Sequence, residues 1–327
     1  MVMQLAPALG FNCNGNLPDP MALAYGAQLY TATLSDATRR LQFSAVIWSP
    51  ISSEAKKTLC YDANQVTSMC AASASFSKDH RAYLNGYGKS AILDDLLSEA
   101  TFYMGDEGGR RVREAVEDAL LRALSTDGTT LAQLEAGAVA TSKSEPLFVV
   151  SESLGSKIII DSLQELETKK AAEFAKNTRS HTGALFLLAN PVPLLNLGAR
   201  GNSTSGRPDA SAHLKAFATA RTSRRQEHSL AQVPIHIVAI SDPNDLLTYQ
   251  LPKDSLSRDD AIITNIIVSN DVTYLWLIES LAAAHENLIL TSLVADAIAL
   301  GSAALSHLHS PVHDRKAQHV APRGRTV

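Results

Sequence analysis

A serine between small residues is the first feature of this sequence that could do chemistry. The segment SESLG (residues 151–155) has small residues two positions before and two positions after Ser153. This spacing is typical of a nucleophile elbow, a strand-to-helix turn so tight that only small side chains fit at its outer positions. The same pattern also occurs in ordinary close turns, so Ser153 needs partners before it can be interpreted as a nucleophile.

The partners that a serine nucleophile needs are a histidine, which removes the hydroxyl proton, and a carboxylate, which orients that histidine. Asp242 and Asp245 directly follow an apolar run at 234–240, and His285 comes later in the chain. Catalytic groups in open α/β sheets lie at the carboxyl ends of the strands, where both aspartates would be placed. The order serine, aspartate, histidine is that of the α/β-hydrolases. The sequence therefore predicts a triad of Ser153, His285 and one of the two aspartates.

Each of these partners also has a purely structural interpretation. Asp242 and Asp245 could end a strand and cap the following turn, since Asp-Pro and Asn-Asp are common turn sequences. His285 follows an apolar stretch, where a single histidine is commonly a hydrogen-bonded structural residue. The required order, and the position of the serine and the aspartates just past expected strands, favour the catalytic interpretation.

The surrounding elements indicate an α/β fold. Short apolar, β-rich runs alternate with longer stretches of helical periodicity, which is typical of a mostly parallel sheet with helices on both faces. We expect helices over 108–124 and 157–175, the second of them entered through the turn at Ser153. The expected strands are 41–48, 146–151, 183–189, 234–240 and 262–268.

Composition and charge narrow the range of functions and locations to expect. The 327-residue chain is 45% hydrophobic and has a net charge of −4, so it has no general attraction for nucleic acid. It has no run of about 20 apolar residues, so no transmembrane segment is expected. Cys13, Cys60 and Cys70 show no CxxC spacing, which predicts buried thiols in a reducing compartment. With no signal peptide apparent, we expect a cytoplasmic protein.

Cofactor sites are not indicated. His307, His309 and His313 lie close together in a proline-containing segment near the end of the sequence and are interpreted as incidental. A nucleotide-binding protein would need a glycine-rich first turn, which the sequence does not show. We therefore expect neither a metal nor an organic cofactor.

Five segments together resemble the ordered blocks of a largely uncharacterised, esterase- and lipase-like group of serine α/β-hydrolases. They are VIWSPIS (46–52), VVSESLGSKIIIDSL (149–163), LFLLANPVPLLNL (185–197), AISDPNDLLTYQLP (239–252) and AAHENL (283–288). The resemblance implies that Ser153 is the nucleophile and His285 the base. It favours Asp245 over Asp242 as the acid, because NDLL (244–247) resembles the acid-bearing loop of such hydrolases.

Composition and the resemblance together predict the organisation of the chain and its substrate. A hydrolase-like domain would cover 1–305, with a flexible, lid-like insertion at 198–232 that is rich in Gly, Ser, Arg and Ala, and a disordered tail at 306–327. The substrate would be a carboxylic ester, either a lipid or a small acylated molecule. Nothing in the sequence predicts the oligomeric state.

One element of the family pattern is missing. Hydrolases of this type carry a His-Gly pair after an early strand, where a backbone N–H helps to form the oxyanion hole. No His-Gly pair occurs in this sequence, so we expect the fold to lack its first strands, through truncation or loss. The Leu154 N–H would remain as an oxyanion donor, and losing the other donor costs about 100- to 1,000-fold in rate. A catalytically impaired, partner-binding protein is therefore the alternative.

Overall fold

The computed structural model describes residues 19–62, 97–168, 171–195, 210–269, 284, 285 and 287–300, together with residues 82, 85, 89, 93 and 94. The expected tail at 306–327, with its three histidines, lies outside the described residues. So do residues 198–209 of the expected lid-like insertion.

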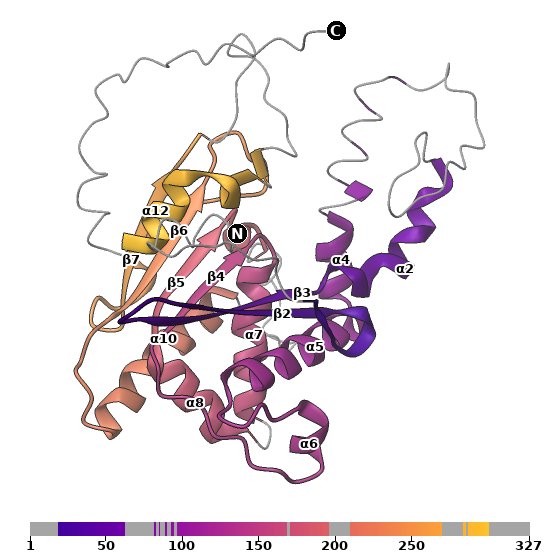
Figure 1. Cartoon of the computed structure of the whole chain (residues 1–327). Coiled ribbons are helices and arrows are strands. Elements are labelled where there is room, and N and C mark those ends of the chain that lie inside the picture. The colour runs from indigo at the N-terminus through magenta and orange to yellow at the C-terminus, as the bar shows by residue number, and fades with distance from the viewer. Residues whose placement is uncertain are drawn as a thin grey trace, which may run out of the picture.

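The centre of the structure is a four-stranded parallel sheet (Figure 1). Its strands, in spatial order, are β4 (Leu147–Glu152), β5 (Thr182–Leu188), β6 (Ile235–Ser241) and β7 (Ala261–Ile267). All neighbouring pairs are parallel. Each strand lies within one residue of a run that the sequence predicted, and the expected α/β class with a parallel sheet is confirmed.

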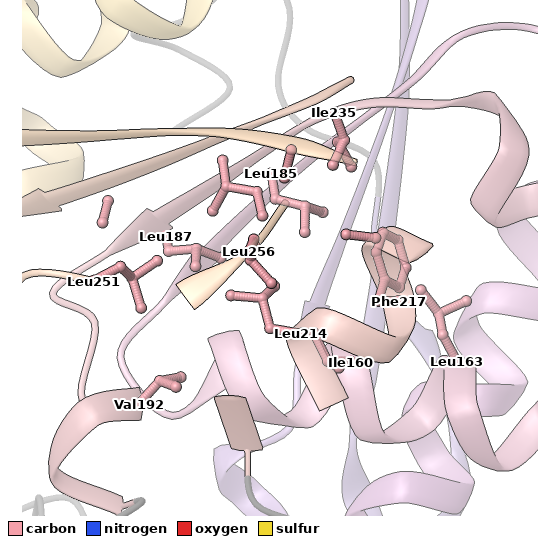
Figure 2. Packing of buried hydrophobic residues seen from close by; sticks show 14 residues of the cluster. Ile160, Leu163, Leu185, Leu187, Val192, Leu214, Phe217, Ile235, Leu251 and Leu256 are labelled. Atoms are coloured by element: carbon pink, nitrogen blue, oxygen red, sulfur yellow. The ribbon is translucent and has the colours of Figure 1, made fainter. Parts of the chain in front are cut away.

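Helices cover both faces of this sheet because alternate residues of its strands are apolar on both sides. On β5, Leu185 and Leu187 pack toward helices α7 (Gly155–Thr168) and α10 (Ala210–Glu227), where they join a cluster shown in Figure 2. Phe186 on the same strand points to the opposite face and packs in the cluster that includes residues of α12 (Ser292–Leu300). A strand buried on both faces needs such a continuous apolar run.

The remaining helices surround this core or connect the strands. The α-helices are α2 (Ser53–Lys56), α4 (Ser98–Met104), α5 (Asp106–Leu124), α6 (Leu131–Glu135), α8 (Ala172–His181) and α9 (Val192–Leu195). The short 3₁₀ helices are η1 (Ala24–Gly26), η2 (Ser49–Ser52), η3 (Lys57–Asp62), η7 (Lys253–Ser255) and η8 (Asn287–Leu290). Helix α5 agrees with the predicted helix at 108–124, whereas the predicted helix at 157–175 is divided between α7 and α8.

The strand expected at 41–48 exists but does not join the parallel sheet. It is β3 (Arg40–Ile47), which pairs antiparallel with β2 (Gln28–Ser35), and β2 pairs in turn with the short β1 (Met21–Ala22). The link between β2 and β3 is short, and the Asp36 carboxylate accepts the Thr38 and Arg39 N–H groups within it. Such a tight connection can join only antiparallel strands, since a parallel pair needs a crossover.

Residues 210–227 of the expected flexible, lid-like insertion are a packed helix in the structure. These residues form α10, whose Leu214 and Phe217 are buried in the core cluster (Figure 2). Arg221 on the same helix is buried and donates hydrogen bonds to the carbonyl oxygens of Thr182 and Val233. The sequence suggested mobility because apolar residues are sparse there, but the few that occur share one side of the helix with Arg221.

Two further observations concern the expected environment of the chain. Cys60 is disulfide-bonded in this structure, which differs from the expectation of free thiols, and its partner lies outside the described residues. None of the described helices combines the length and apolar character that crossing a membrane requires.

Candidate active site

Ser153 lies at the turn that joins the end of β4 to the start of α7. Its φ angle of 50° is in the left-handed region, which is uncommon for a residue other than glycine and costs about 1–3 kcal/mol. The Ser153 N–H donates to the Leu188 carbonyl oxygen at 2.8 Å, which holds the turn to the end of β5. The sequence SESLG therefore forms a strained strand–turn–helix junction with the serine at its apex.

The small residues on either side of the serine face each other across this turn. A Cβ atom placed on Gly155 would lie 3.8 Å from the Ser151 Cβ, an ordinary contact distance for a methyl group. Ser151 itself is buried. There is room for one added carbon between these positions.

His285 brings together two parts of the chain that are far apart in sequence. Its Nε2 lies 2.8 Å from the Ser153 Oγ, 132 residues away, and its Nδ1 lies 2.8 Å from the Asp245 Oδ2. With the proton on Nδ1, the imidazole donates to the carboxylate and accepts the serine O–H at Nε2. The side chains of His285 and Asp245 are only 3% and 2% exposed, whereas Ser153 is partly exposed. Ser153 is thus less buried than the pair behind it.

Asp245, and not Asp242, is the carboxylate that His285 binds. Asp242 instead makes hydrogen bonds within the same loop. Its Oδ1 accepts the Asn244 N–H at 2.8 Å, and its carbonyl oxygen accepts the Asp245 N–H at 3.2 Å. Asp242 therefore shapes the turn that presents Asp245. The Asp245 Oδ1 accepts the Leu247 N–H, so that Oδ2 faces the imidazole.

Leu154 follows the nucleophile position and begins the first turn into α7. The residue is 5% exposed, and its side chain belongs to an apolar cluster with residues of β2, η2 and α5. Its backbone N–H makes no backbone hydrogen bond within the described part of the chain. This N–H is therefore a backbone donor directly after Ser153 in sequence that no main-chain carbonyl of the described residues engages.

Two asparagines that the sequence analysis did not single out contact the loop that carries Asp245. The Asn190 carbonyl oxygen accepts the Tyr249 N–H at 3.2 Å, and the Asn265 side chain binds both backbone groups of Leu251. The signal that could have identified Asn265 is its polarity within the otherwise β-rich run AIITNII (261–267). The signal for Asn190 is weaker, because asparagine is common just after a strand.

The described part of the chain has no group of three or more His, Cys, Asp or Glu side chains arranged to hold a metal ion. The chemistry that the arrangement itself can perform is proton transfer. A serine O–H, an imidazole and a carboxylate in series can move a proton off the hydroxyl and stabilise the resulting imidazolium.

Comparisons with protein-family models, with curated proteins and with solved structures found no match to this chain.

Proposed function

We propose that this protein is a serine hydrolase that acts on a carboxylic ester through Ser153, His285 and Asp245. The observation that carries the proposal is the position of His285, whose two ring nitrogens lie 2.8 Å from the Ser153 hydroxyl and 2.8 Å from the Asp245 carboxylate. The left-handed φ of Ser153 adds support, because backbone strain of this kind collects at functional sites.

In the proposed reaction the Ser153 Oγ attacks the ester carbonyl carbon, and His285 Nε2 accepts the serine proton. The carbonyl oxygen becomes an oxyanion, which the Leu154 N–H stabilises. His285 then gives its proton to the departing alcohol, which leaves an acyl group on Ser153. A water molecule, deprotonated by the same nitrogen, attacks this acyl group and releases the acid. Asp245 holds the imidazole in the tautomer that each step requires.

The proposed substrate is a lipid or a small acylated molecule. Its support comes from the resemblance to esterase- and lipase-like hydrolases and from the surface next to the acid. Leu246 and Tyr249, on the loop that carries Asp245, are 57% and 47% exposed. Exposed apolar residues on the loop that carries the candidate acid suit a substrate with an apolar acyl or alcohol group.

A non-catalytic binding protein on a hydrolase-like fold is the alternative, and the absent His-Gly pair favours it. In the four-stranded sheet, β4 is the outermost strand, with no described strand on its other side. This agrees with a hydrolase-like fold without its first strands, in which the second oxyanion donor would be missing. The rate would then be lower by about 100- to 1,000-fold than with both donors.

A fluorophosphonate probe separates the two proposals, because it reacts covalently with activated serines. The wild-type protein should be labelled, and Ser153→Ala should not. Ser44→Ala, which removes an exposed serine on β3, is the matched control and should be labelled like the wild type. A folded wild-type protein that stays unlabelled would contradict the hydrolase proposal and favour the binding protein.

A further inference from the structure

We infer that Asn265 is a positioning residue that holds the acid loop, residues 242–251, in the place from which Asp245 reaches His285. The inference rests on the proposed function, since it assigns Asn265 a part in the same site. Asn265 lies on β7, which two strands, β5 and β6, separate from the strand that leads to Ser153.

Asn265 forms a two-bond clamp with a single residue of the acid loop. Its Oδ1 accepts the Leu251 N–H at 2.9 Å, and its Nδ2 donates to the Leu251 carbonyl oxygen at 2.8 Å. One amide side chain thus pairs with both main-chain groups of Leu251, as a neighbouring strand would. Two hydrogen bonds to the same residue fix its orientation as well as its position.

The place of Asn265 in its strand argues that this clamp is the reason for the asparagine. Ala261 and Ile263, which precede it at two-residue intervals, pack into the apolar cluster between the sheet and α10. Asn265 faces the same side and lies opposite Ala239 of β6, which is buried in that cluster. An amide beside such a core is costly unless it is hydrogen-bonded, and asparagine is disfavoured in strands. The bonds to Leu251 offset that cost.

The clamp closes the downstream end of the acid loop. The Leu251 side chain is 4% exposed and lies in the cluster of Figure 2, while its backbone is held by Asn265. Nearer to the acid, the Tyr249 N–H is bound by the Asn190 carbonyl oxygen. The loop forms no strand ladder in the described structure, so these bonds hold its downstream end, while the turn bonds of Asp242 and Asp245 shape its start. Without the clamp the end of the loop can move, and Asp245 is six positions upstream of it.

The test compares the labelling rate with a fluorophosphonate in the wild type, Asn265→Val and Asn265→Ala. Valine suits a strand and has a similar size, so it removes both hydrogen bonds while favouring a folded protein. Both variants should be labelled about 10- to 100-fold more slowly than the wild type, since a displacement of about 1 Å can cost 100-fold. The matched control is Ile266→Ala on the same strand, which removes apolar contacts on the opposite face and should be labelled at the wild-type rate.

A second measurement works whether or not the protein is a hydrolase. The His285 Nδ1–H, bound to Asp245, should give a downfield proton resonance in the wild type that is absent from His285→Gln. The resonance should broaden or disappear in both Asn265 variants and persist in Ile266→Ala.

The outcomes are distinguishable. An unlabelled wild type contradicts the proposed function. In that case the resonance is the measurement that tests the role of Asn265. The inference is overturned if the Asn265 variants keep the wild-type resonance or the wild-type labelling rate. It is also overturned if Ile266→Ala loses as much labelling rate or resonance intensity as the Asn265 variants do, or if the wild type lacks the resonance.

Discussion

His285 Nδ1 lies 2.8 Å from Asp245 Oδ2, although 40 residues separate the two in sequence. Both side chains are almost fully buried. A buried imidazole whose other nitrogen contacts a partly exposed serine hydroxyl is oriented by the carboxylate behind it. This pair is the relationship on which the expected chemistry of the chain depends.

Removing the imidazole should abolish the reactivity of Ser153. We expect His285→Gln to lower the rate of fluorophosphonate labelling by at least about 10⁴-fold, because no other group would accept the serine proton. The control is His181→Gln, at the end of α8, where the imidazole contacts a carbonyl oxygen of its own helix. Equal labelling of His285→Gln and wild type would show that Ser153 is activated by some other group.

The two aspartates of the acid loop should respond differently to the same substitution. Asp245→Asn should lower the labelling rate by about 10⁴-fold, because an amide no longer favours the tautomer with a proton on Nδ1. Asp242→Asn should have a much smaller effect, since an asparagine Oδ1 can still accept the Asn244 N–H. Measuring both variants at one pH with the same probe decides between the two candidate acids. A larger loss in Asp242→Asn would reverse the assignment.

The turn at Ser153 should tolerate one added carbon at position 155 and no more. A Cβ on Gly155 would meet the Ser151 Cβ at 3.8 Å, so Gly155→Ala should leave the free energy of unfolding nearly unchanged. Gly155→Leu would force a larger side chain into the same space and should lower the free energy of unfolding by about 1–3 kcal/mol. Urea denaturation of the two variants measures the difference. Equal stability of both would mean that the outer positions of the turn are not crowded.

A polar cluster around Asp161 on α7 should make the stability of the protein sensitive to acid. Burial alone would raise the pKa of Asp161, but the hydrogen bond from His213 and the nearby charge of Lys157 outweigh it, and the pKa is lowered. Tyr103 also donates to this carboxylate at 2.6 Å. A carboxyl group whose pKa falls on folding stabilises the protein above its unfolded pKa of about 3.9 and loses this contribution as the pH falls through the folded pKa.

The variant Asp161→Asn tests the direction in which pH changes this contribution to stability. At pH 7 it should be less stable than the wild type by about 3 kcal/mol, because it leaves the largely buried Lys157 ammonium without its carboxylate. The difference should shrink as the pH falls below about 4, where the carboxyl becomes protonated in the unfolded wild type, and should be lost as the pH passes through the lower pKa of the folded state. Urea denaturation from pH 7 to pH 2 follows the two proteins in parallel. A difference that stays constant over this range would contradict the lowered pKa.

Local patterns in the sequence were enough to predict the strands of the parallel sheet and the turn at Ser153. Strands buried on both faces are continuous apolar runs, and a tight strand-to-helix turn requires small residues such as Ser151 and Gly155. Because parallel strands end at one edge of their sheet, the sequence also predicted that Ser153 and the two aspartates would lie near each other.

Only the tertiary structure decided which partners meet. The resemblance favoured Asp245 over Asp242, but the contact itself depends on a turn in which Asp242 caps the backbone that presents Asp245 to His285. The burial of α10 and the clamp between Asn265 and Leu251 are likewise contacts between distant segments. Sequence periodicity reports which faces are apolar, but it carries no information on which hydrogen-bonding groups come within about 3 Å once the chain is packed.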